Sequence, residues 1–454
     1  MVSDILAQFN ELAESLLKLE KETPALSYRS PEQFHRLIDL KINSEGFDEK
    51  DLVQILKTIA ENTTKTSGHR FFNQLFGGRI DIAVVADMLA SLLNISMYTY
   101  KVAGVHVLLE QEIVNKMCSF IGFSEGEGIF TPGGSLSNMI AMIMARNEAD
   151  HSIKQTGIPV NKFIAYTSCQ SHYSVTKNAG IVGIGRQNVR QITVDYSGKM
   201  RLAELEETIQ SDMAAGFKPF FINATTGTTV LGAFDDVEKI ADIAEKYEIW
   251  LHVDGAWGGS MILNEKYQHL FKGAERADSF TWDAHKMMGV PLIASTILTR
   301  EKGMLKKHFS EPADYLFQAD DDFLNPGTRS IQCGRRNDVL KVWAAWKCLG
   351  DQGYAARIDK LRANALYLAK KIDEDNELQL LCQPESLNIC FDVPEKSSQQ
   401  ICDYLDRNGI IKVGYGVFKN KSFIRAICVN PEMTEEDLDF FVEQIKAAAA
   451  KIID

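Results

Sequence analysis

Hydrophobic residues between about 129 and 300 alternate between short apolar runs and stretches with helical spacing. Apolar positions from Val237 to Tyr247 recur at the spacing of a helix, and Asp235 and Asp236 precede them as capping residues. Strands that alternate with helices predict βαβ units around a mainly parallel central sheet. Short runs without helical spacing are typical of buried strands, and five runs fit: Lys162–Tyr166, Val189–Val194, Pro219–Asn223, Ile249–Asp254 and Ser295–Thr299.

Both ends of the chain follow a different pattern. From Met1 to Leu19 charged residues stand among the apolar ones, as in an amphipathic helix and unlike a signal peptide. Ser422–Val429 is strand-like, and Thr434–Asp437 is an N-cap sequence that opens a helix reaching Ala450. Because 454 residues exceed what one hydrophobic core serves, we expect three parts: residues 1–100, a large α/β domain at 101–345 and a small α+β domain at 346–454.

Composition narrows the functional classes. Hydrophobic residues make up 45% and charged residues 24% of the chain, which is typical of folded globular proteins. The net charge of −12 disfavours nucleic acid and anionic membranes as partners, and no apolar run is long enough to span a bilayer. Eight cysteines without CxxC or zinc-ligand spacing predict reduced thiols, no metal centre and a cytoplasmic location.

Lys286 is the first candidate for chemistry. It lies in the apolar segment Ser279–Gly289, just before a predicted strand, where a free ammonium group is costly to bury. A covalent bond to the aldehyde of pyridoxal 5'-phosphate (PLP) removes that cost and makes the lysine useful in catalysis. Asp254, at the end of an earlier predicted strand, is the candidate counter-charge for the pyridine nitrogen of PLP.

Two further segments complete the expected PLP site. Gly133-Gly134-Ser135 leads into the apolar helical run Met139–Ala145, and a glycine turn at a helix N-terminus suits a phosphate group. His172 can stack on one face of the pyridine ring while Ala256 packs on the other. Taken singly, these residues have ordinary structural explanations: Asp254 as a turn residue, the glycines as a loop and His172 as a core or surface histidine. The combination favours a cofactor site.

In this order, the segments resemble the group II PLP-dependent amino acid decarboxylases, in particular the branch of glutamate decarboxylase and cysteine sulfinate or aspartate decarboxylase. The likeness covers most of the chain, from His69–Leu75 (HRFFNQL) through Gln332–Arg336 (QCGRR) to Phe423–Arg425. It implies a type I fold, as in aspartate aminotransferase, and an obligate homodimer with active sites at the interface. The N-terminal part would then contribute to the dimer and the substrate pocket, and the large domain would bind PLP.

The resemblance also assigns roles by position. Lys286 matches the lysine that carries PLP as a Schiff base, Asp254 the partner of the pyridine nitrogen, and His172 the stacking residue. His285 matches the histidine beside the lysine, so Lys286, His172 and His285 are the candidate catalytic residues. Arg425 matches the arginine that binds the α-carboxylate of the substrate. Further contacts with the cofactor are expected from Gly134, Ser135, Thr225 and Ala256.

Gln74, Ser96 and Tyr98 match the family positions that contact the distal acidic group of the substrate. Glutamate decarboxylases usually have Asn and Phe where this chain has Ser96 and Tyr98, whereas cysteine sulfinate decarboxylases usually have Ser and Tyr. A tyrosine hydroxyl shortens the pocket and adds a hydrogen-bond donor. The pair therefore predicts α-decarboxylation of cysteine sulfinate to hypotaurine or of aspartate to β-alanine. Alternatives are glutamate, which gives γ-aminobutyrate, 2,4-diaminobutyrate, a decarboxylation coupled to oxidative deamination, and a silent PLP-fold scaffold.

Several positions depart from the family pattern. Ala319–Cys333, which we expect to include a mobile active-site loop, lacks the tyrosine that often protonates the reaction intermediate, and Leu324 stands about where that tyrosine would be. His285, His172 and water are left as alternative proton donors. Further departures are Asp283-Ala284 in place of Asn-Pro, and Lys101, Gly104 and His106 in place of Glu, Pro and Phe.

Overall fold

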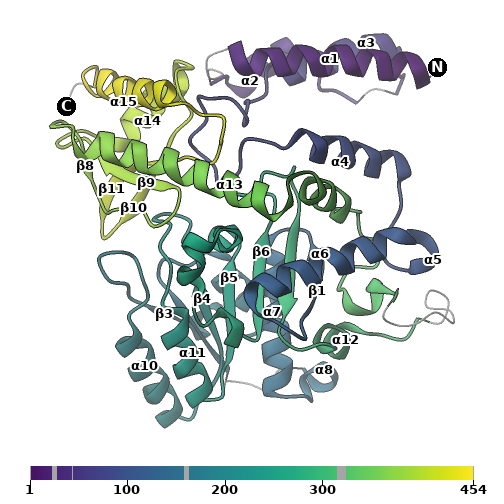
Figure 1. The fold of residues 1–454 in the computed structure, drawn as a ribbon, viewed down its shortest axis with the longest axis vertical. Helices are drawn as coiled ribbons and strands as arrows, with labels where there is room; N and C mark the ends of the chain where they lie inside the picture. The colour runs from purple at the N-terminus through teal and green to yellow at the C-terminus, as the bar shows by residue number, and fades with distance from the viewer. Residues whose placement is uncertain (1, 23–27, 43, 158–162, 314–323, 453–454) are drawn as a thin grey trace. The chain divides into compact units, whose positions relative to one another are not determined.

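The computed structural model describes residues 2–22, 28–42, 44–157, 163–313 and 324–452, which divide into two compact units (Figure 1). The first unit comprises Met1–Gly78, Ala363–Gln383 and Leu387–Asp454, and the second comprises Arg79–Arg362 and Pro384–Ser386. These boundaries differ from the predicted ones at 100 and 345. The N-terminal residues join the C-terminal part because Phe72 donates its N–H to Lys412 O at 2.7 Å and accepts from Ile427 N at 2.9 Å.

A seven-stranded sheet forms the centre of the second unit in the described residues. Its strands are β1 (Glu127–Thr131), β2 (Phe163–Ser168), β3 (Val189–Ile192), β4 (Lys218–Thr225), β5 (Trp250–Gly255), β6 (Ser279–Asp283) and β7 (Ser295–Thr299). They lie in the order β1-β7-β6-β5-β4-β2-β3, and β7 is antiparallel to both of its neighbours while β2 to β6 are parallel. The predicted mainly parallel sheet is confirmed, and the five predicted apolar runs overlap β2, β3, β4, β5 and β7, with ends that differ by up to two residues.

Helices cover this sheet. α7 (Gly134–Ala149) lies across β4 to β7, while α10 (Leu202–Ala214) and α11 (Val237–Lys246) contact β4 (Figure 1). The predicted helix at Val237–Tyr247 is confirmed as α11, and Asp236 caps it by accepting from Lys239 N at 3.2 Å. The remaining helices are α4 (Asp81–Leu93), α5 (Tyr100–Ala103), α6 (Val105–Ile121), α8 (Ile153–Thr156), α9 (Ser174–Ile181), α12 (Met304–Phe309), α13 (Val339–Asp373, which continues into the first unit), and the 3-10 turns η1 (Arg186–Asn188), η2 (Gly258–Leu263), η3 (Glu265–Phe271), η4 (Ala274–Arg276) and η6 (Pro326–Arg329).

The first unit is built on a small antiparallel sheet in the order β10-β11-β9-β8, from β8 (Gln379–Leu380), β9 (Asn388–Asp392), β10 (Gly414–Phe418) and β11 (Lys421–Ile427). The predicted C-terminal strand and helix are β11 and α15 (Glu435–Ala449). Thr434 and Asp437 form the capping box of α15, in which Asp437 N donates to Thr434 Oγ1 at 3.3 Å. This confirms the small α+β part. Its other helices are α1 (Val2–Glu22), α2 (Pro31–Leu37), α3 (Glu49–Glu61) and α14 (Ser398–Arg407).

The parallel strands end together at one edge of the large sheet. In the register, Thr225 of β4 faces Asp254 of β5, and Asp254 faces Thr281 of β6. In open α/β sheets this carboxyl edge is where ligands bind, because the loops that follow the strands leave a crevice there. Throughout the described ranges, the helices are too short or too polar to cross a lipid bilayer.

Candidate active site

A cavity of about 230 Å³ opens at the carboxyl edge of β4, β5 and β6. All eight residues predicted to bind the cofactor line it: Gly134, Ser135, His172, Thr225, Asp254, Ala256, His285 and Lys286. They come from the start of α7, the β2–α9 connection and the ends of three strands, so only the folded sheet brings them together.

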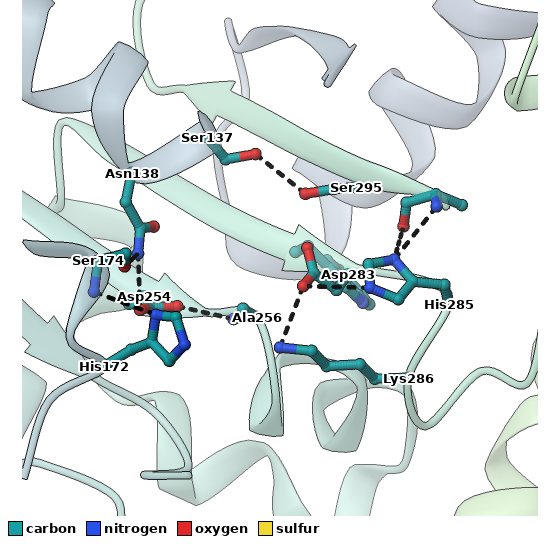
Figure 2. A network of polar contacts seen from close by, with 12 residues as sticks. Ser137, Asn138, His172, Ser174, Asp254, Ala256, Asp283, His285, Lys286 and Ser295 are labelled. Carbon is teal, nitrogen blue, oxygen red and sulfur yellow. Dashed lines mark hydrogen bonds and ion pairs between the residues drawn. The ribbon is translucent and has the colours of Figure 1, made fainter. Parts of the chain in front are cut away.

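Lys286 follows β6 by three residues, and its side chain is 20% exposed within the cavity. Its Nζ lies 3.1 Å from Oδ2 of Asp283, the last residue of β6, whose side chain is 2% exposed (Figure 2). Burial opposes ionisation of Asp283, but the charge of Lys286 outweighs it, so the pKa of this carboxyl lies below its ordinary value. Lys286 is therefore paired with a buried carboxylate.

Asp254 is held by two hydrogen-bond donors. Asn138 Nδ2 donates to Asp254 Oδ2 at 2.8 Å, and Ala256 N donates to Asp254 Oδ1 at 3.1 Å (Figure 2). On its other side, Asn138 Oδ1 lies 3.1 Å from His252 Nε2, and because a carbonyl oxygen only accepts, His252 donates. Burial lowers the pKa of His252 to about 4, so this histidine is neutral near pH 7. The chain His252–Asn138–Asp254 fixes the orientation of the carboxylate.

His172 reaches the cavity from the segment between β2 and α9. Its Nδ1 accepts from Ser174 N at 3.3 Å, which places the proton of the neutral ring on Nε2 (Figure 2). Burial, partly offset by the charge of Asp254, lowers the pKa of His172. His172 is therefore an uncharged ring near pH 7, and its flat face can stack on a heteroaromatic cofactor.

The start of α7 forms another wall of the cavity. Gly133, with a φ of 110°, turns the chain into the helix, and the N–H groups of Gly134 and Ser135 have no acceptor within the helix. There is no room for a side chain at position 134, since a Cβ would lie 2.9 Å from Asp283 Oδ2 and 3.1 Å from Ala256 Cβ. Free N–H groups at a helix N-terminus bind anions such as phosphate.

His285 lies on the turn between Asp283 and Lys286. Its Nδ1 is 3.0 Å from Ala294 O, and its Nε2 is 3.7 Å from Asp283 Oδ2. Burial lowers the pKa of His285 against the opposing charge of Asp283, so this ring is also neutral near pH 7. The cavity thus contains one lysine, two carboxylates and two neutral imidazoles.

The predicted substrate residues lie outside the lining of this cavity. Gln74 and Arg425 belong to the first unit, where Gln74 lines a cavity of about 660 Å³ and Arg425 Nη2 donates to Asn73 O at 2.9 Å. Ser96 and Tyr98 belong to the second unit, in the short segment between α4 and α5. Geometry therefore places the predicted cofactor residues together and leaves the substrate residues as predictions.

Ser96 and Tyr98 are held by the segment at 327–335. Ser96 Oγ accepts from Arg335 N at 3.1 Å, and Tyr98 O accepts from Gly327 N at 2.9 Å. Arg335 is itself fixed by a buried two-point ion pair with Glu110, at 2.5 and 2.6 Å.

Residues 319–323 of the expected active-site loop lie outside the described residues. Of the remainder, Leu324 is half-buried, and Asn325 is buried and accepts from Tyr100 N at 3.3 Å.

Three functional positions were missed in the sequence. His252 precedes Asp254 by two residues, so the two side chains share one face of the strand. This spacing is the only local signal for the place of His252 in the network. Asn138 lies just after the glycine turn, but its bond to Asp254 joins residues 116 positions apart. Asp283 was noted only as a departure from the family. The further lining residues are Tyr173, Gly227, Thr229 and Trp257.

The residues present fit PLP. Lys286 offers an amine that can bond to an aldehyde, Asp254 is a buried carboxylate at the cavity wall, and the start of α7 offers N–H donors for a phosphate. His172 and Ala256 supply the flat aromatic and small apolar surfaces that suit the two faces of a ring.

Comparison with known proteins points the same way. A family model for the pyridoxal-dependent decarboxylase conserved domain matches residues 31–394. The chain is 39% identical over 441 residues to acidic amino acid decarboxylase GADL1 from Bos taurus, covering 92% of this chain and 85% of that protein. It is 38% identical over 442 residues to cysteine sulfinic acid decarboxylase from Homo sapiens, covering 92% and 90%. The crystal structure of mouse CSAD superposes with a TM-score of 0.96 at 33% identity over 99% of both chains.

Proposed function

The chain belongs to the family of pyridoxal-dependent decarboxylases and is a PLP-dependent carboxy-lyase, and from this premise we propose that it acts on a small acidic amino acid. The proposed substrates are cysteine sulfinate, converted to hypotaurine, and aspartate, converted to β-alanine. The observation that carries the proposal is the single cavity lined by Lys286, Asp254 and the six other predicted cofactor residues. The names of the relatives, which act on cysteine sulfinic acid or on acidic amino acids, support the substrate class.

When bound, PLP supplies an aldehyde that takes up the amino group of the substrate and a protonated ring that withdraws electrons from the bond to the departing carboxylate. Lys286 holds the cofactor covalently between turnovers. Asp254, oriented by Asn138 and by Ala256 N, keeps the proton on the ring nitrogen. The uncharged ring of His172, which lines the cavity, would pack on one face of the cofactor ring.

Three further residues complete the proposed cofactor site. Gly134 and Ser135 bind the phosphate through their N–H groups. Thr225 lines the cavity, and its hydroxyl lies 3.1 Å from Ser171 Oγ. His285 packs beside Lys286 as a neutral ring.

Four residues are proposed to bind the substrate. Arg425 binds the α-carboxylate, since an arginine pairs well with a carboxylate. Gln74, Ser96 and Tyr98 bind the distal acidic group. Because Ser96 Oγ already accepts from Arg335 N, its hydroxyl hydrogen stays available for donation to an acidic group.

A panel of amino acids tests the substrate. We expect hypotaurine or β-alanine as the dominant product when PLP-loaded protein is incubated with cysteine sulfinate, aspartate, glutamate and 2,4-diaminobutyrate, with mass spectrometry of the amines. The double variant Ser96→Asn, Tyr98→Phe lengthens the pocket and removes a donor. It should therefore shift the ratio of kcat/KM toward glutamate by about 10-fold or more, the scale of one lost hydrogen bond.

Each result of this panel is informative. Dominant γ-aminobutyrate from the unaltered protein would show the substrate to be wrong while leaving the decarboxylase activity intact. The absence of every amine would contradict the activity and favour the silent scaffold. Release of ammonia and peroxide together with an aldehyde would identify the coupled oxidative deamination.

We propose in addition that the protein is a homodimer. The support is an exposed apolar face on α4, formed by Ile82, Val85, Leu89 and Leu92, which recur at helical spacing. Apolar faces of this kind mark contact surfaces, and a two-fold axis lets one face cover its own copy.

We also propose a cytoplasmic location, because the eight cysteines are free thiols, as in a reducing compartment.

The variant Leu92→Glu tests the dimer. Leu92 is 70% exposed in the single chain, so a charge there is tolerated by the fold but is costly to bury in an interface. We expect the dissociation constant of the dimer to rise roughly 100-fold, or about 2.7 kcal/mol, as measured by sedimentation velocity across a concentration series. Met213→Glu, on the exposed side of α10, is the matched control and should leave the dimer unchanged. Equal dissociation constants for Leu92→Glu and the unaltered protein would remove α4 from the interface.

A further inference from the structure

Asp283 is a second buried carboxylate in the cofactor cavity, and the family pattern usually has a neutral asparagine there. Its Oδ2 lies 3.1 Å from Lys286 Nζ, and its side chain is 2% exposed. A buried carboxylate without a cation is costly, so the pair with Lys286 is what makes an acid tolerable at this position.

The other oxygen of Asp283 lacks a hydrogen-bond partner in the described part of the chain. The hydroxyl of Ser295, its register neighbour on β7, favours the charged form of Asp283, but its hydrogen bond at 3.0 Å goes to Ser137 Oγ. Asp283 is therefore held mainly by Lys286, and its charge acts on that lysine.

The space beside Asp283 is open because residue 134 is a glycine. A Cβ at position 134 would lie 2.9 Å from Asp283 Oδ2, so the absence of a side chain on Gly134 lets the carboxylate reach the lysine. The same carboxylate faces the start of α7, where the phosphate of the cofactor is proposed to bind.

We propose that Asp283 is a positioning residue for the cofactor lysine: its buried carboxylate, 3.1 Å away, holds Lys286 Nζ in the cavity and supplies the negative charge beside this nitrogen. The inference rests on the proposed role of Lys286. Only an uncharged amine can add to an aldehyde, with water as the other product, so the ion pair with Asp283 has to give up its proton before Lys286 binds PLP. After the linkage forms, the same charge stabilises the protonated nitrogen.

No other titratable group in the described chain provides this charge at the same distance. His172 and His285 face Lys286 as neutral rings, because burial lowers the pKa of both. Asp254 acts on His172 and is held by Asn138 and Ala256 N. Lys341 of α13 acts on His285, and ion pairs at 3.1 and 3.3 Å tie it to carboxylates of Asp338 and Asp87.

Competitive labelling of the cofactor-free protein measures the effect. The yield of acetylated Lys286 peptide after acetic anhydride treatment, followed by mass spectrometry over a pH series, gives the pH of half-maximal reaction. In Asp283→Asn this pH should fall by about 1–3 units, the range for loss of one close opposite charge. Asp212→Asn is the matched control, because this buried acid of the same unit pairs with Arg190 and Tyr166, and its curve should not move. An unmoved curve for Asp283→Asn overturns the proposal.

A reciprocal variant covers the case in which Asp283→Asn does not fold. In Lys286→Met the carboxyl of Asp283 loses its cation and should take up a proton, which adds a protonated-carboxyl band to the infrared spectrum at neutral pH. A spectrum without that band contradicts the pairing.

Borohydride trapping with PLP separates this inference from the proposed function. If the unaltered protein gives a reduced PLP adduct on Lys286, the role of the lysine stands, and a visible-absorbance titration of the loaded Asp283→Asn variant should show the lower midpoint again. If no adduct forms, the proposed function fails, while the labelling curves still decide whether Asp283 controls the lysine.

Discussion

Replacing Lys286 by alanine is expected to lower the decarboxylation rate at least about 10³-fold, or about 4 kcal/mol of transition-state stabilisation. The lysine is the amine in the cavity wall, and its Nζ is held at 3.1 Å from Asp283. Without it, the cofactor has no covalent attachment, and an amine from solution must release each product. The rate falls strongly because an amine held in the site has a much higher effective concentration than an amine in solution.

Turnover and attachment are measured together for this variant. Product formation is followed by mass spectrometry, and borohydride reduction followed by peptide mapping locates the cofactor adduct. Lys239→Ala, which removes an exposed lysine paired with Asp236 on the surface, should keep both the adduct and the rate. A rate in Lys286→Ala within 10-fold of the unaltered protein, or an adduct on another lysine, would show that Lys286 is not the attachment site.

Local pattern was sufficient to predict the large sheet, and together with the family resemblance it selected residues that line one cavity. The strands β4 and β5 are short apolar runs, and the sequence places Asp254 at the end of the second, so a parallel sheet brings it to the edge where β4 also ends, at Thr225. The capping sequence at Thr434 likewise identified the start of α15.

Features that depend on long-range pairing were not predictable in this way. The segment around Phe72 joins the first unit through its bonds to Lys412 and Ile427, partners more than 300 positions away. The bond between Asn138 of helix α7 and Asp254 of strand β5 has no local signal in the sequence around Asn138. The contact of Asp283 with Lys286 was not predictable either, because it depends on the direction in which Lys286 points and on the space left at Gly134.

Asp254→Asn is expected to cause the second large loss, about 10²- to 10³-fold in kcat/KM, because one close ionic partner shifts a proton equilibrium by about 1–3 units and each unit is about 1.4 kcal/mol. Asp254 is 4% exposed, and Asn138 Nδ2 and Ala256 N orient its two oxygens. The amide has nearly the same shape but no charge, so the ring nitrogen of the cofactor loses its proton and the ring withdraws electrons less well.

The experiment compares kcat/KM on the preferred substrate with PLP affinity from absorbance titration. The loss in Asp254→Asn should fall mainly on kcat, since the phosphate and Lys286 still hold the cofactor. Asn138→Leu should give a smaller loss, about 10-fold, because it removes one charge-assisted hydrogen bond and leaves the carboxylate in place. Asp212→Asn, a buried acid outside the cavity, serves as the control for the loss of a buried charge. If kcat/KM of Asp254→Asn lies within 3-fold of the unaltered protein, another group keeps the ring protonated. A larger loss of kcat/KM in Asn138→Leu than in Asp254→Asn would then show that Asn138 contributes more than Asp254.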